Sequence, residues 1–339
     1  MNSNIFEEKK RKILQTFKEK NFEEVIAAGE KLLSEKKNDA QLIYLLALAS
    51  INVQKFFKAE EYIDNLLCYK ETDQLYFVKG NIQKKLKRYH EAIKSFEKSI
   101  ELNPSFSEAY NNLGNTKKIL KQQELAIECF KKAINLKPDN FQALFNLSSI
   151  YKENNNYKEL ILVYDKILQL DKNNIKTLYN LGSAHLFLGN FSKAKEYFKK
   201  IFQLDKTHIP SIRNYILITK IDNDDEIFNY IKNKDIQNLN QEEKILITNA
   251  LSKGYFDLGN NEHGLKNLTA ANLIKRKNSN FSLDEEKKRF ENIKNFFSKT
   301  QYYNLNFDDK YLSKPVFILG MPRSGTTLLE QILSTHSKI

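Results

Sequence analysis

Residues 107–140 have the sequence SEAYNNLGNTKKILKQQELAIECFKKAINLKPDN, and the stretches 73–106, 141–174 and 175–208 align with it at a spacing of 34 residues. The eighth position of each stretch holds a small residue: Gly80, Gly114, Ser148 and Gly182. Two helices can approach closely at a small residue, while large residues at positions 4 and 24 fill the space between neighbouring units. The pattern predicts a helix-turn-helix unit that repeats along the chain.

The repeated stretch resembles a tetratricopeptide repeat, whose unit is about 34 residues long. Within 107–140 the residues at the signature positions are Tyr110, Leu113, Gly114, Leu120, Ala126, Phe130, Ala133 and Pro138. The stretch 39–72 fits with one inserted residue near Phe56, and 6–38 supplies a recognisable second helix, 23–33. The resemblance implies a mainly α fold, a right-handed superhelix of stacked helix pairs.

The repeat pattern changes after residue 208. Residues 209–222 begin another first helix, and the polar stretch 222–241 is interpreted as a junction. Two further helices, 242–258 and 262–277, flank Gly259 and are expected to form a divergent terminal unit. We therefore expect an N-terminal helical repeat at 1–38, tetratricopeptide repeats at 39–221, a divergent repeat and linker at 222–298, and the start of a further domain at 299–339.

The composition restricts the partners and the compartment. The net charge of +12 comes almost entirely from Lys, and Arg, which makes bidentate contacts with phosphates and bases, appears only six times, so no specific nucleic-acid binding is expected. The N-terminus has no apolar signal-peptide core, and the most apolar run, 42–51, is too short to cross a bilayer. Cys68 and Cys129 are expected to be buried thiols. These features favour a cytoplasmic protein without a membrane partner.

Four asparagines occupy position 6 of consecutive repeats: Asn112, Asn146, Asn180 and Asn214. We call this set the asparagine ladder. First helices line the concave face of such an array, so the ladder is expected to follow that groove. An amide has both donors and an acceptor, so it can hold the backbone of an extended peptide. The ladder therefore predicts a peptide or protein partner, although Asn is also common in this chain and at this position of the repeat family.

The stretch 315–339, PVFILGMPRSGTTLLEQILSTHSKI, has a different pattern. Val316–Leu319 is expected to be a short strand, Met321–Gly325 a loop, and Thr326 the beginning of a helix. This order directs backbone N–H groups and the positive helix end at a phosphate. The two glycines have the spacing of a Walker loop, but Thr326 stands where the Walker lysine belongs, which disfavours an ATPase or GTPase.

Residues 320–336 resemble the 5′-phosphosulfate loop and first helix of sulfotransferases, in the version of bacterial tetratricopeptide-fused and tyrosylprotein-type enzymes. The stretch 258–277 is similar to the linker between repeats and catalytic domain in those proteins, whereas Ser337 departs from the usual Pro. The resemblance implies transfer of sulfuryl from 3′-phosphoadenosine 5′-phosphosulfate to a hydroxyl, such as that of a protein tyrosine, without a metal. It assigns phosphosulfate binding and charge stabilisation to Arg323, and phosphate binding to Ser324, Gly325, Thr326 and Thr327.

Two functions remain open at this stage. In the family, the catalytic base and the 3′-phosphate site lie downstream of this helix, so we expect the chain alone to be an inactive, truncated sulfotransferase. The alternative is a non-enzymatic repeat scaffold for protein–protein interaction. Elsewhere, no His, Cys or carboxylate has metal-ligand spacing. The four histidines before residue 300, among them His185, are expected at the surface or in the groove.

Overall fold

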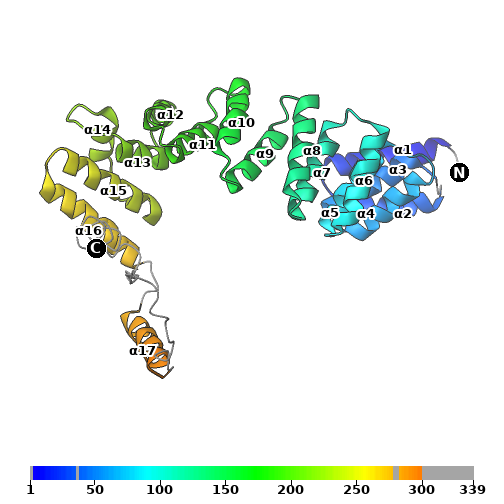
Figure 1. The fold of residues 1–339 in the computed structure, drawn as a ribbon. Helices are drawn as coiled ribbons and strands as arrows, with labels where there is room; N and C mark the ends of the chain where they lie inside the picture. Colours follow the sequence, from blue (N-terminus) through cyan, green and yellow to red (C-terminus); the bar gives the residue numbers. More distant parts are fainter. Residues whose placement is uncertain (1–2, 36–37, 278–281, 300–339) are drawn as a thin grey trace, which may run out of the picture. The chain divides into compact units, whose positions relative to one another are not determined.

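The computed structural model describes residues 3–35, 38–277 and 282–299, all of whose regular structure is α-helical (Figure 1). Two compact units are present, Met1–Lys275 and Arg276–Ile339. The predicted strand 316–319 and the loop after it lie outside the described residues. None of the helices in the described ranges is long and apolar enough to cross a membrane.

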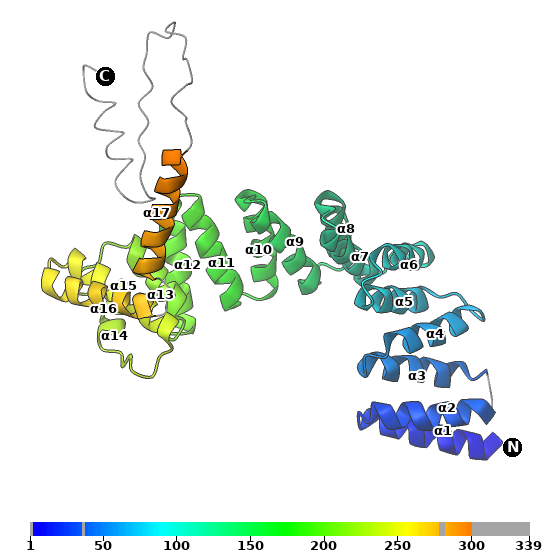
Figure 2. The ribbon, with the colours of Figure 1, turned by 90° about the horizontal axis from the view of Figure 1, so that it is seen from below.

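Helices in the first unit follow one another in pairs, each pair joined by a short turn. Their bounds are α1 (Ser3–Lys18), α2 (Phe22–Glu35), α3 (Ala40–Asn52), α4 (Phe56–Leu67), α5 (Asp73–Lys85), α6 (Tyr89–Leu102), α7 (Ser107–Ile119), α8 (Gln123–Leu136), α9 (Phe141–Glu153), α10 (Tyr157–Leu170), α11 (Ile175–Phe187) and α12 (Phe191–Leu204). Each helix packs mainly on its neighbours in sequence (Figure 2). The predicted array of helix-turn-helix repeats is therefore confirmed.

In three repeats the two helices meet where a glycine at position 8 lies against a buried phenylalanine ring at position 24. A Cβ atom at Gly182 would lie 2.6 Å from Phe198 Cε1, so any larger residue there would collide with the ring. The other two pairs are Gly80 with Phe96 and Gly114 with Phe130. Since each phenylalanine is fully buried, the glycine lets the second helix lie directly on the first.

The repeat 141–174 is closed differently. Ser148 and Tyr164 replace the glycine and the phenylalanine, and both are buried. Ser148 Oγ donates a hydrogen bond of 2.9 Å to the backbone oxygen of Phe145, and burial raises the pKa of Tyr164. In this repeat α9 and α10 pack less closely on each other than the two helices of each glycine-bearing repeat do.

The turn inside each repeat depends on one residue in the left-handed region. The φ angles at Lys87, Lys121, Asn155 and Gly189, which are 34 residues apart, are 61°, 62°, 54° and 74°. Only Gly189 adopts such an angle without steric cost. The repeat therefore imposes this turn even on residues that disfavour it.

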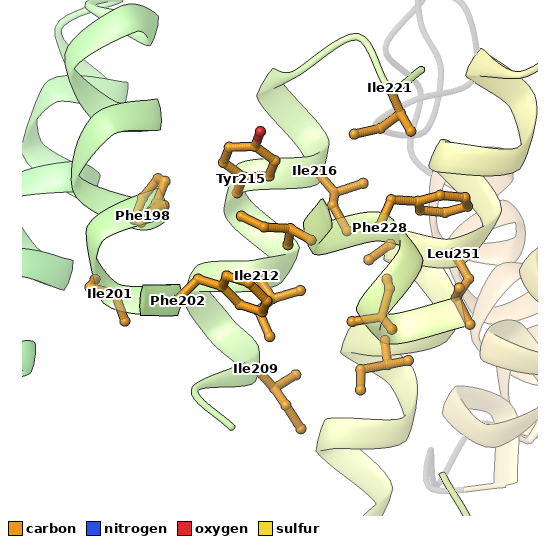
Figure 3. Packing of buried hydrophobic residues seen from close by; sticks show 14 of the residues in the cluster. Phe198, Ile201, Phe202, Ile209, Ile212, Tyr215, Ile216, Ile221, Phe228 and Leu251 are labelled. Atoms are coloured by element: carbon orange, nitrogen blue, oxygen red, sulfur yellow. The ribbon is translucent and has the colours of Figure 1, made fainter. Parts of the chain in front are cut away.

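The sequence pattern does not predict α14 (Glu226–Lys232), which lies within the polar stretch 222–241 and follows α13 (Ile209–Ile218). Its side chains Ile227, Phe228 and Ile231 are buried in a cluster with residues of α12, α13 and α15, part of which Figure 3 shows. Phe228 packs on Gly254. This tertiary contact gives a short polar segment an apolar face to bury.

The predicted terminal pair is present as α15 (Gln241–Asp257) and α16 (Asn261–Lys277). Asn240 and Glu243 form a capping box at the beginning of α15. Asp257 Oδ2 accepts a 2.8 Å hydrogen bond from the backbone N–H of Ile221, and the Lys253 ammonium contacts both Asp257 and the backbone oxygen of Thr219. These bonds fasten the end of α13 to α15.

The second unit includes α17 (Leu283–Lys299), a helix in the stretch that the sequence assigns to a linker. Two other expectations about single side chains are wrong. Cys68 is exposed, because it lies just past the end of α4, and His185 is buried, because it faces the ring of Tyr197. Cys129 is partly buried, and both thiols are free.

Candidate functional site

The asparagine ladder lies on the first helices α7, α9, α11 and α13. Three of its amides donate hydrogen bonds to the first helix of the preceding repeat. Asn146 Nδ2 donates to Asn111 Oδ1 at 3.0 Å, and Asn112 Nδ2 donates to Asn81 Oδ1 at 2.8 Å. Asn214 Nδ2 donates to the Tyr179 hydroxyl at 3.3 Å, and Asn214 is only 9% exposed. These three side chains link consecutive repeats.

Asn180 is different, since its amide makes no hydrogen bond among the described residues. The preceding repeat explains this. In that repeat, position 5 is Phe145, whose ring cannot accept a hydrogen bond as Asn111 and Tyr179 do in other repeats. Position 9 is Ser149, whose hydroxyl already accepts from Lys118 and donates to Glu153. Asn180 is partly exposed, so its donors and its acceptor are available to a ligand.

A small hollow, here called the cup, lies beside Asn180 and has a volume of about 20 Å³. Its lining comes from α9, α10 and α11: Lys152, Tyr157, Leu160, Tyr164, Asn180, Ser183, Ala184 and Phe187. The Tyr157 and Phe187 rings are stacked, with centroids 5.0 Å apart and planes 12° apart. Because Phe187 is 72% exposed, much of the stacked pair remains open to solvent.

A second series, which the sequence analysis misses, is formed by Lys84, Lys118 and Lys152 at position 12 of consecutive repeats. Lys84 Nζ lies 5.9 Å from the centroid of the Phe96 ring, and burial lowers the pKa of Lys84. Lys118 donates to Ser149 and to Glu153, each at 2.8 Å, and its bond to Glu153 lowers the pKa of that carboxyl. Lys152 is exposed and has no carboxylate partner within the described ranges. The 34-residue spacing was the signal for this series.

A larger cleft, with a volume of about 530 Å³, lies between α8, α9 and α10. Its apolar lining includes Leu144, Leu147 and Val163, and Asp165 also lines it. Burial raises the pKa of Asp165. Nearby, the His185 ring stacks on Tyr197 with centroids 5.6 Å apart, and burial, reinforced by Lys193, lowers the pKa of His185.

No cluster of three His, Cys, Asp or Glu side chains suited to a metal ion occurs in the part of the chain that the structure describes. The predicted phosphosulfate-binding residues lie outside the described residues: Arg323, Ser324, Gly325, Thr326 and Thr327.

Comparison with known proteins supports two assignments. Tetratricopeptide repeat models match residues 74–106, 107–140, 129–160 and 175–208. A sulfotransferase family model matches residues 315–339. The protein is thus a tetratricopeptide repeat protein with a short sulfotransferase-family match at the C-terminal end of this sequence.

Similar proteins add detail to both parts. An uncharacterised protein of Aquifex aeolicus is 69% identical over 26 residues, which cover 8% of this chain and only 3% of that protein. The C-terminal part of a tetratricopeptide repeat protein from Cytophaga hutchinsonii has a TM-score of 0.56 at 18% identity, covering 76% of this chain and 98% of that one. YrrB, described as a tetratricopeptide repeat protein with an unusual peptide-binding site, has a TM-score of 0.44 at 22% identity, covering 55% and 96%. The Cytophaga structure supports the repeat fold alone.

Proposed function

We propose that the array binds an extended peptide segment of a partner protein across the first helices α9 and α11. The observation that carries this proposal is that the Asn180 amide makes no hydrogen bond among the described residues and lines the cup together with the exposed Phe187 ring. A peptide backbone presents N–H and C=O groups that an Asn amide can satisfy together. The other ladder amides already bond within the array, so they hold the platform while Asn180 contacts the peptide.

Phage-displayed dodecamer peptides selected on the purified chain would test this proposal. Asn180→Ala should weaken the selected peptides about tenfold in calorimetric titrations, because two backbone hydrogen bonds are lost. Asn112→Ala is the matched control, since the Asn112 amide already donates to Asn81. Failure to select any peptide, or equal affinity of wild type and Asn180→Ala, would contradict the proposal.

A second proposed function concerns residues 315–339, which the sulfotransferase family model matches. We propose that this stretch binds 3′-phosphoadenosine 5′-phosphosulfate. Arg323 would pair with the phosphosulfate, and the backbone N–H groups of residues 324–327 would surround the 5′-phosphate, with hydroxyls of Thr326 and Thr327 as further donors. A partner protein bound to the array would then supply the hydroxyl that accepts the sulfuryl group, for example that of a tyrosine.

In such a transfer the bond between sulfur and the bridging phosphate oxygen breaks while a bond forms between sulfur and the acceptor oxygen. The acceptor hydroxyl would pass its proton to a catalytic base, which in the family lies downstream of this helix, and the nucleotide would leave as adenosine 3′,5′-bisphosphate. Negative charge therefore grows on the leaving phosphate, where Arg323 offsets it most effectively in the transition state.

Binding of adenosine 3′,5′-bisphosphate to the purified chain tests the nucleotide part of this proposal. Arg323→Ala should reduce the affinity at least about tenfold, because it removes a charge-assisted contact with phosphate. Lys338→Ala removes the same charge outside the loop and should leave the affinity unchanged. Absence of binding, or equal loss in both variants, would contradict the assignment.

A further inference from the structure

We infer that the cup beside Asn180 is a specificity pocket for one small apolar side chain of the bound peptide, and that Lys152 binds an acidic residue next to it. This inference rests on the peptide binding proposed above and specifies the chemistry of the peptide. It follows from the size of the cup, the rigidity of its wall and the charge at its rim.

Size restricts what can enter. The cup has a volume of about 20 Å³, and a void needs about 10–15 Å³ to hold one water molecule. A methyl-sized group therefore fits, whereas a leucine or an aromatic ring does not. Leu160, Ala184 and the two stacked rings make most of the wall apolar, so a methyl group is preferred over a polar group without partners.

The wall is held in place by the core of the array. Leu160, Tyr164 and Ala184 are each only 2% exposed, so the floor cannot yield without disturbing the packing between α9, α10 and α11. The Tyr157 hydroxyl donates to Asn155 Oδ1 at 3.1 Å, which helps to fix one ring of the stacked pair. Phe187 is the exposed part of the wall, and it can be truncated without opening the core.

Charge at the rim favours an acidic neighbour. Lys118 occupies the equivalent position one repeat earlier, and its ammonium is occupied by Glu153 and Ser149. Lys152 lines the cup and has no carboxylate partner in the ranges that the structure describes. A ligand carboxylate beside the cup would give Lys152 the partner that Glu153 gives Lys118. With Asn180 on the backbone, three contacts of different kinds then define one register of the peptide.

A positional scan of a selected peptide tests this assignment. In wild type, Ala or Thr at one position should be preferred over Leu or Phe about tenfold or more, as expected when a rigid pocket is too small for the larger group. Phe187→Ala should abolish that preference while small-residue peptides still bind. Wild type should prefer an acidic residue next to the small one by about threefold, and Lys152→Glu should reverse this, so that a basic residue is preferred there.

Controls separate this inference from the proposed function. Lys199→Glu makes the same charge change at an exposed residue of α12 and should leave the neighbour preference intact. If Asn180→Ala weakens every peptide but Phe187→Ala keeps the size preference, peptide binding stands and the pocket assignment is wrong. If the size preference is absent in wild type, the pocket assignment also fails. Far-ultraviolet circular dichroism of each variant checks that the helices are retained.

Discussion

The repeats 107–140 and 141–174 have the same length and the same asparagine at position 6, yet they pack differently. In the first, Gly114 lets Phe130 lie against α7, and a Cβ atom at Gly114 would be 2.9 Å from the ring. In the second, Ser148 and Tyr164 leave α9 and α10 with fewer close approaches. Both the 530 Å³ cleft and the cup are lined by residues of this second repeat. Positions 8 and 24 thus affect how closely the two helices of a repeat pack, and the cleft and the cup both border the less closely packed pair.

The largest expected effect comes from removing the ring that closes the tight repeat. Phe130→Ala should lower the free energy of unfolding by about 3–5 kcal/mol, because a fully buried aromatic side chain is replaced by a cavity. Phe187→Ala, which truncates a ring that is 72% exposed, should change it by no more than about 0.5 kcal/mol. Urea unfolding followed by circular dichroism measures both, and similar losses in the two variants would refute the distinction.

Adding a single methyl group should separate the two repeats next. Gly114→Ala places its Cβ against Phe130, and overpacking of this kind costs about 1–3 kcal/mol, partly offset by about 1 kcal/mol of helix propensity. Ser148→Ala only removes a hydroxyl and its bond to Phe145, so its cost should stay within about 1 kcal/mol. Thermal unfolding of the two variants compares them directly. A greater loss in Ser148→Ala would show that the second repeat is the more tightly specified one.

The ladder allows a third comparison, in which one substitution lowers stability and the other weakens binding. Asn146→Ala removes the bond to Asn111 and should cost about 1 kcal/mol of stability. Asn180→Ala removes no bond within the described structure and should leave the melting temperature unchanged, although it weakens a selected peptide. Calorimetric unfolding and titration on the same samples test this. Equal melting temperatures for both variants would contradict the assignment of Asn146 to a structural role.

The smallest effect concerns pH. Burial is the main cause that lowers the pKa of His185 in the folded chain, and Asp165 opposes it only in part. Folding therefore disfavours the charged imidazole. The free energy of unfolding is highest above the unfolded pKa of about 6.5, where His185 is neutral in both states, and it decreases as the pH falls below that value. The pKa of Asp165 is raised, so its own contribution has the opposite sign and is gained only at more acidic pH.

Hydrogen exchange at about pH 7.5 and about pH 5.5 measures this dependence. After correction for intrinsic exchange rates, protection of α11 should fall relative to α7 at the lower pH, since the repeat 107–140 contains no histidine. His185→Gln should remove the difference between the two helices. An unchanged difference in that variant would assign the pH dependence to other groups.

The sequence predicted the repeat fold because its determinants recur at fixed positions: a small residue at position 8 and a large one at position 24 act within one unit. It did not predict α14, because Ile227, Phe228 and Ile231 are the apolar residues of a helix of only 7 residues in a polar stretch, and their burial depends on contacts such as that of Phe228 with Gly254. Such a contact joins residues far apart in sequence, so no local window contains it.

For the candidate site, the sequence pattern identified the equivalent asparagines but not their hydrogen bonds. The 34-residue spacing located Asn180 among its equivalents, whereas its availability depends on Phe145 and Ser149 of the preceding repeat. Only the hydrogen bonds of the structure show that Asn112, Asn146 and Asn214 are already engaged. The lysine series was visible at the same spacing. The structure adds that Lys118 is paired with Glu153, whereas Lys152 has no carboxylate partner among the residues that it describes.

The replacement of glycine and phenylalanine by Ser148 and Tyr164 between α9 and α10 has a mechanical consequence. Stress applied along a linear series of contacts is the same at every contact, and the softest one takes up most of the strain. α9 and α10 pack less closely on each other, and on α8 and α11, than the paired helices of the glycine–phenylalanine repeats on both sides do. We therefore expect bending of the array under load from a tethered partner to concentrate between α8 and α11. The proposed peptide site lies within this segment, and a bound peptide that bridges α9 and α11 would act as a brace across it.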